Sequence, residues 1–166
     1  DQNQEALRDN DIVFDEEQTD SLYYALFHSR PVWDDAATFE AYMFGLQEND
    51  EPDVRTKNRD LLTLGLCLVD KADPGEFGYE WESTYQFGES RATKASADTT
   101  DLAHRAQFHH LEGAYRFEGS AKTRVAAMFD YASGDKDPND DENNRYDTLY
   151  GVPRGDFGPT DLFGAF

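Results

Sequence analysis

The sequence predicts an all-β domain whose antiparallel strands run up and down in chain order. Apolar and polar residues alternate with period two over four stretches, as on strands with one apolar and one polar face. Acidic turns rich in Asp, Asn, Pro and Gly separate these stretches. Aromatic residues make up 14% of the chain, whereas disordered acidic chains are poor in them. No linker interrupts the pattern, so we expect residues 1–166 to form a single domain.

For the first expected strands, the sequence does not show which face is the apolar one. Residues 22–28 and 39–46 are aromatic-rich runs of strand length, but apolar residues occupy both of their faces. Residues 12–14 could add a short strand. The segment 34–44 also fits helical spacing, since Ala36, Phe39, Tyr42 and Met43 would share one side of a helix.

The next two strands show the alternation most clearly. In the first, Leu62, Leu64, Leu66 and Leu68 lie on one face, opposite Arg59, Leu61, Thr63, Gly65 and Cys67. In the second, over residues 79–87, one face carries Tyr79, Trp81, Ser83, Tyr85 and Phe87, and the other carries Glu80, Glu82, Thr84 and Gln86. Each therefore has an apolar and a wet side.

The later strands repeat this pattern with one break. Residues 111–117 alternate, but Arg105, Gln107 and His109 share the apolar parity earlier in the same run, which suggests that its beginning lies in water. Residues 124–131 place Val125, Ala127, Phe129 and Tyr131 opposite Arg124, Ala126, Met128 and Asp130. With a further strand in 146–166, we expect seven or eight strands.

Charge and cysteine content exclude several classes of protein. The formal net charge is −20, which disfavours nucleic acid as a partner because phosphates would be repelled. The single cysteine, Cys67, rules out an intrachain disulfide framework. No apolar run approaches the roughly 20 residues of a transmembrane helix. A membrane β-barrel is not excluded, because only every second residue of its strands faces lipid.

Two architectures fit the alternation. In a soluble barrel or sandwich, the apolar face points inward and the charged face meets water. In an outer-membrane barrel, the apolar face meets lipid and the charged groups line a wet lumen. Aromatic residues near the expected strand ends, such as Tyr79, Phe87 and Tyr131, favour the membrane arrangement, in which they form girdles.

One long motif adds a family resemblance. Residues 129–140 (FDYASGDKDPND), 145–151 (RYDTLYG) and 156–159 (DFGP) resemble the alginate-export family of bacterial outer-membrane porins. The stretches 85–88 (YQFG) and 111–117 (LEGAYRF) are in the same style. The likeness is strongest over 129–159 and extends with varying strength from about Asp11 to the end of the chain.

This resemblance implies an outer-membrane barrel of about eighteen antiparallel strands that passes an anionic polysaccharide through an arginine-lined constriction. The chain is too short for such a barrel, and its net charge opposes the passage of a polyanion. It is therefore a segment of a larger barrel, a small closed barrel, or an oligomer paired through its open strand edges, since unpaired edges are not tolerated in lipid.

The candidate functional residues are charged groups on the polar parity. If the apolar faces meet lipid, these groups point into the lumen, where Arg forks would bind the carboxylates of a uronate polymer and acidic neighbours would hold the forks in place. Arg145 and Arg154, within the matching motif, are added as weaker candidates. The set is Arg59, Glu80, Glu82, Glu112, Arg116, Arg124, Asp130, Arg145 and Arg154. The alternative is a solvated sheet face with weak ion pairs.

Metal and catalytic sites have little support. Asp135, Asp137 and Asn139 have the spacing of the start of a calcium loop, but the Gly and Glu expected later in such a loop are missing, so a turn with Asx hydrogen bonds competes with Ca²⁺ binding. Glu80 and Glu82 are spaced like the carboxylates of an inverting glycosidase, but alternating Glu is common on wet faces. We therefore expect no enzyme and no cofactor other than this possible Ca²⁺.

The sequence thus predicts a channel in the bacterial outer membrane, in contact with its lipid, that passes an acidic polysaccharide or a small anionic solute. The alternative is a soluble β-barrel or sandwich that binds a carbohydrate or an apolar ligand.

Overall fold

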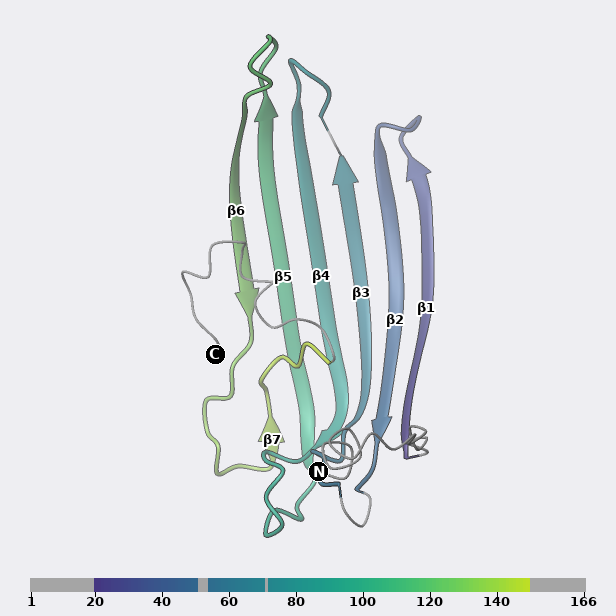
Figure 1. The fold of residues 1–166 in the computed structure, drawn as a ribbon, viewed down its shortest axis with the longest axis vertical. Helices are drawn as coiled ribbons and strands as arrows, with labels where there is room; N and C mark the ends of the chain where they lie inside the picture. Colours follow the sequence, from purple (N-terminus) through teal and green to yellow (C-terminus); the bar gives the residue numbers. More distant parts are fainter. Residues whose placement is uncertain (1–19, 51–53, 71, 150–166) are drawn as a thin grey trace, which may run out of the picture.

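The computed structural model describes residues 20–50, 54–70 and 72–149, which form one all-β sheet. Its six long strands are adjacent in chain order and all antiparallel (Figure 1). They are β1 (Ser21–Val32), β2 (Ala37–Glu48), β3 (Asp60–Asp70), β4 (Phe77–Ser90), β5 (Leu102–Arg116) and β6 (Arg124–Ala132). The prediction of an up-and-down antiparallel fold is confirmed. The expected strand at 12–14 lies outside the described residues.

The sheet is not closed. Within the described part of the chain, β1 and β6 each pair with one long strand, so the outer edge of β1 and that of β6 lack strand partners there. The fold is therefore that of a barrel segment, which was one of the predicted alternatives. None of the described residues forms a helix long and apolar enough to cross a membrane.

The connections differ in length between the two ends of the sheet. The connections from β1 to β2, from β3 to β4 and from β5 to β6 lie at one end, which we call the short-turn end. The connections from β2 to β3 and from β4 to β5, together with residues 133–141 after β6, lie at the other, the long-loop end. Residues 34–36 belong to the first turn and residues 37–44 to β2, so the helical alternative for 34–44 is wrong.

Neighbouring residues on β3 show how different the two faces are. Leu64 and Leu66 are 42% and 43% exposed, whereas Thr63, directly before Leu64, is 2% exposed. Leu64 lies opposite Tyr85 and Leu68 lies opposite Trp81, so the leucines continue into the aromatic residues of β4. We call this the apolar face; on β3 to β6 it comprises Leu62, Leu64, Leu66, Leu68, Trp81, Tyr85, Phe87, Leu111, Tyr115, Val125, Phe129 and Tyr131.

The opposite face, called the polar face below, carries most of the predicted functional residues. Strand register places on it Glu40 of β2, Cys67 of β3, Glu80 and Glu82 of β4, His110, Glu112 and Arg116 of β5, and Arg124 and Asp130 of β6. The sequence alternation over β3 to β6 predicts this division correctly. Arg105 lies on the apolar parity near the long-loop end and is exposed there, with Glu142 as its ion-pair partner.

Register also settles the facing of the first two strands. Tyr42 lies opposite Gly65, and Phe27 lies opposite Tyr42, so all three belong to the polar face. Leu26 and Met43 lie on the apolar face. The polar face of β1 and β2 is therefore rich in aromatic side chains, unlike that of β3 to β6.

After β6 the chain returns along the sheet. The two-residue strand β7 (Glu142–Asn143) pairs in parallel with the start of β5, at Ala103 and His104. Residues 144–149 then cross the polar face, where Asp147 contacts Arg59 and Gln86. No sequence pattern predicts β7. Of the strand expected in 146–166, residues 146–149 are not a strand and the rest lie outside the described residues.

Candidate functional site

An ion pair and a hydrogen-bonded pair lie side by side on the polar face between β5 and β6. Arg124 donates to Glu112, and His110 pairs with Asp130, the residue opposite it in register. Arg116 lies opposite Arg124, and its guanidinium has no hydrogen-bond or ion-pair partner among the described residues. Together with Glu80 and Glu112, these two arginines line a hollow at the short-turn end of the sheet. This hollow brings both signs of charge together on the polar face.

A tyrosine links three strands in the middle of this face. The side chain of Tyr42 extends from β2 across β3, over Gly65, where a Cβ atom would lie 2.0 Å from its ring. Its hydroxyl donates to the Glu82 carboxylate and is 2.9 Å from Thr84 Oγ1, both on β4. Because glycine leaves room for the ring, Tyr42 lies along the sheet, and its hydroxyl bridges to β4.

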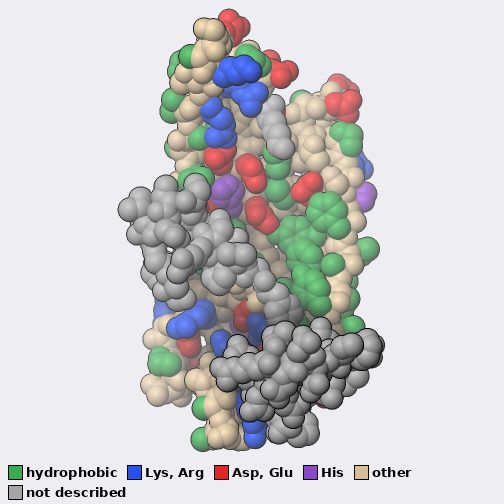
Figure 2. All heavy atoms as spheres, in the orientation of Figure 1, with side chains coloured by type: hydrophobic (Ala, Val, Ile, Leu, Met, Phe, Trp, Pro, Cys, Tyr) green, Lys and Arg blue, Asp and Glu red, His purple; other side chains and the backbone are tan. Residues whose placement is uncertain are grey.

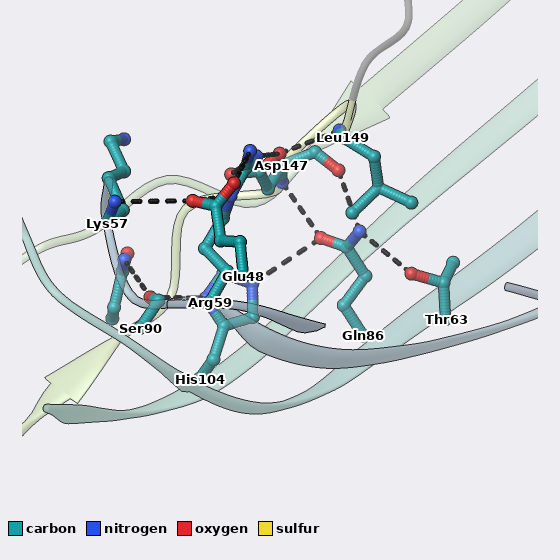
Figure 3. Close-up of polar contacts among 10 residues, drawn as sticks. Glu48, Lys57, Arg59, Thr63, Gln86, Ser90, His104, Asp147 and Leu149 are labelled. Carbon is teal, nitrogen blue, oxygen red and sulfur yellow. Dashed lines mark hydrogen bonds and ion pairs between the residues drawn. The ribbon is translucent and has the colours of Figure 1, made fainter. Parts of the chain in front are cut away.

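A second cluster at the long-loop end ties residues 144–149 to the sheet (Figure 3). Arg59 donates through Nε and Nη2 to both oxygens of Glu48, each at 2.8 Å, and through Nη1 to Asp147, at 2.9 and 3.1 Å. The side chains of Arg59 and Glu48 are only 11% and 6% exposed. Such bidentate pairing fixes the guanidinium in one geometry. We call Glu48, Arg59, Gln86 and Asp147 the Asp147 cluster.

Gln86 holds the same segment through its amide. Its Nε2 donates to the backbone oxygen of Asp147 at 2.7 Å and to Thr63 Oγ1 at 3.0 Å, while its Oε1 accepts from the Asp147 backbone N–H at 2.8 Å. Gln86 is fully buried. Among the described residues, no buried side-chain nitrogen or oxygen lacks a hydrogen-bond partner. This satisfied network anchors residues 144–149 over β3 and β4.

Electrostatics favours the charged form of Arg59, which lies just before β3. Burial opposes its charge, but the hydrogen bonds and charges of Glu48 and Asp147 outweigh burial and raise its pKa. In the long loops, Asp50 is held by the backbone N–H of Thr56 and by Arg91 and Arg55, which together lower its pKa. Arg59 is thus committed to internal partners rather than open to a passing solute.

The polar-face strands carry more negative than positive charge. In the half toward the short-turn end, Figure 2 shows acidic side chains gathered near the centre of the face and basic ones at its upper edge. The carboxylates there are Glu40, Glu80, Glu82, Glu112 and Asp130, and the guanidiniums are Arg116 and Arg124. A second hollow, lined by Asp35, Glu40, Asp70 and Glu80, is acidic.

The predicted site residues therefore divide into three groups. Glu80, Glu82, Glu112, Arg116, Arg124 and Asp130 share the polar face, where Glu112 pairs with Arg124. Arg59 belongs to the Asp147 cluster at the other end. Arg145 is exposed beyond β7, and Arg154 lies outside the described residues.

The loop after β6 forms the predicted Asx turn. Asp137 Oδ1 accepts from the backbone N–H of Asn139 at 3.1 Å. In residues 20–50, 54–70 and 72–149, no group of three or more His, Cys, Asp or Glu side chains is placed to hold a metal ion. Calcium binding by Asp135, Asp137 and Asn139 stays an untested prediction.

Sequence reasoning missed several residues that organise the polar face. Asp147 lies 88 residues from Arg59 in the chain, and no local pattern links them. Glu48 and Tyr42 have a signal that could have been used, since both share the parity of Glu40 once β2 is taken as a strand. The parity of Gln86 predicts its place on the polar face but indicates no role for its amide.

Comparison with known proteins agrees with this arrangement. A family model described as alginate export matches residues 6–165, nearly the whole chain. The chain has no significant match among curated proteins or solved structures. With an antiparallel sheet that exposes leucines on one face and gathers ion pairs on the other, and with a family match over almost its full length, this chain belongs to the alginate-export family.

Proposed function

We propose that this chain forms part of the wall of a channel in the bacterial outer membrane that passes an acidic polysaccharide or a small anionic solute. The observation that carries the proposal is the difference between the two faces of one strand, β3. Leu64 and Leu66 are exposed, whereas Thr63 is almost completely buried. A soluble barrel would require the reverse arrangement, with the leucines inside. The family match supports the same direction.

The open edges favour a segment of a larger barrel over a small closed one. Unpaired N–H and C=O groups along β1 and β6 would each cost several kcal/mol in lipid. Further strands beside β1 and β6 would satisfy them, and residues 1–166 would then be one segment of a single barrel domain. Barrels of this kind have short periplasmic turns and longer extracellular loops. By that rule the Asp147 cluster lies near the extracellular side.

Arg116 and Arg124 are the groups on the described strands best placed to meet an anion. Both line the hollow at the short-turn end, and the Arg116 guanidinium has no hydrogen-bond or ion-pair partner among the described residues. Planar guanidinium forks bind carboxylates bidentately. The neighbouring Glu80 and Glu112 would limit how tightly the anion is held, so that the solute moves on. Passage of this kind is passive and involves no catalysis and no cofactor.

Ion selectivity in planar bilayers tests the proposal. The whole protein should form conducting channels, and Arg116→Glu or Arg124→Glu should shift the reversal potential in a salt gradient toward cation selectivity. Lys94→Glu is the matched control, because Lys94 is exposed in the loop between β4 and β5, away from these arginines. An unchanged reversal potential in both arginine variants would remove the proposed role of these residues.

The soluble alternative has its own test. The whole protein should require detergent or lipid to stay monodisperse after purification. If it remains monodisperse in plain buffer, its leucines are not lipid-facing, and the channel proposal fails in favour of a soluble sugar-binding or apolar-ligand-binding protein.

A further inference from the structure

Four aromatic rings lie together on the polar face, where the charged residues would lead one to expect only hydrophilic groups. Tyr23 and Phe27 come from β1, and Tyr42 and Phe44 come from β2. The ring centroids of Phe27 and Tyr42 are 6.5 Å apart, those of Tyr42 and Phe44 are 5.1 Å apart, and those of Tyr23 and Phe44 are 6.0 Å apart. We call this continuous set the aromatic stripe.

The stripe lies along the sheet rather than standing up from it. Tyr42 reaches across β3 over Gly65 to its hydrogen-bond partners on β4. The Phe27 ring is only 12° from parallel with the Tyr42 ring, so it has nearly the same inclination. Phe27 remains 57% exposed. Figure 2 shows hydrophobic side chains gathered on this side of the face, next to the acidic ones.

Carboxylates border these rings on the same face. Glu82 accepts from the Tyr42 hydroxyl, and Glu40 accepts from Ser29 Oγ at 3.2 Å. Arg116 and Arg124 lie on β5 and β6, several strands away, and Arg59 at the long-loop end is paired with Glu48 and Asp147. The surroundings of the stripe are therefore acidic and rich in hydrogen-bond acceptors.

We propose that the aromatic stripe binds neutral pyranose rings of a glycan chain by stacking, with Glu40 and Glu82 accepting hydrogen bonds from sugar hydroxyls. The C–H bonds on the face of a sugar ring are polarised by the attached oxygens, and the negative face of an aromatic ring attracts them. The bordering carboxylates complement hydroxyl donors but repel a uronate carboxylate. The occupant that fits is an uncharged stretch of polysaccharide.

This inference rests on the proposed channel, because it requires the polar face to line the path of the solute. It goes beyond that function by assigning β1 and β2 a different ligand chemistry from β5 and β6. The aromatic stripe recognises ring faces and hydroxyls, while Arg116 and Arg124 meet negative charge.

Blockage of single-channel current by short glycans tests the inference. The probes are a neutral β-1,4-linked mannohexaose and the hexamer of the corresponding uronic acid, applied to the whole protein in a planar bilayer. Mannohexaose should block the wild-type channel. The double variant Phe27→Leu/Phe44→Leu, which removes two rings but stays apolar, should weaken this block about tenfold. Block by the uronic-acid hexamer should change less.

Phe39→Leu is the matched control, because Phe39 lies on β2 but on the apolar face. It should leave the block by mannohexaose unchanged. The inference fails if the protein conducts but mannohexaose does not block the wild-type channel. It also fails if mannohexaose blocks the double variant as strongly as the wild type. In both cases the channel proposal stands. Equal weakening by Phe39→Leu also overturns it. Absence of any conductance would refute the channel itself.

Discussion

Replacing Arg59 with methionine should destabilise the protein far more than replacing a comparable exposed arginine. The change removes four hydrogen bonds. It also removes the guanidinium that pairs with Glu48, whose side chain is only 6% exposed. The Asp147 carboxylate, which the guanidinium had bridged to Glu48, would then repel it. Both effects act on groups with little access to water.

The magnitude follows from the burial of the pair. Removing one partner of a buried ion pair costs about 3–5 kcal/mol, because the other charge is left unpaired. Asp147 is 18% exposed and regains some water, so we expect a loss near the lower limit, about 3 kcal/mol. The control is Arg55→Met. Arg55 pairs with Asp50 but is 52% exposed, and exposed pairs are worth about 0–1 kcal/mol.

Urea unfolding of the whole protein refolded into lipid vesicles, followed by tryptophan fluorescence, measures both free energies. A loss below about 1 kcal/mol for Arg59→Met, equal to that for Arg55→Met, would refute the reasoning. The Asp147 cluster would then contribute little to the free energy of unfolding.

Three further predictions follow from other parts of the sheet. Leu64→Arg should cost about 2–4 kcal/mol in the same urea assay, because it places a charge on the lipid face, and a neutral result would contradict that facing. Gln86→Leu should speed hydrogen exchange at the Asp147 backbone amide, which loses its acceptor; unchanged protection would show that Gln86 does not hold the segment. Asp50→Asn should make the loop between β2 and β3 more sensitive to protease. Since the pKa of Asp50 is lowered by folding, its contribution is present at neutral pH and is lost as pH falls below its ordinary value of 3.8; a wild-type loop equally resistant at pH 7 and pH 2.5 would contradict this.

The sequence predicts the facing of β3, β4, β6 and the second half of β5 because the alternation is unbroken there and period two leaves only one choice of faces. Leu64 and Thr63 illustrate this, since neighbouring residues fall on opposite sides as expected. On β1 and β2 the same method fails. Phe27 and Tyr42 are aromatic on the polar parity, so both faces look apolar and only pairing with β3 reveals the facing.

The Asp147 cluster shows a second limit. Its members come from β2, the loop before β3, β4 and the segment after β7, and their contacts depend on where the returning chain crosses the sheet. No periodicity encodes such a crossing. The pairing of Glu112 with Arg124 could be predicted, because adjacent antiparallel strands bring same-face residues together across one hairpin.

Nitroxide scanning of residues 61–69 in a Cys67→Ser background measures whether the leucine side of β3 faces lipid. Collision rates with oxygen, which concentrates in lipid, and with a water-soluble nickel chelate would be compared along the strand in vesicles. If the leucines face lipid, oxygen collisions reach a maximum at every second position, 62, 64, 66 and 68, with little oxygen contact at 61, 63 and 65. The opposite phase, or high nickel collision at Leu64 and Leu66, would contradict it.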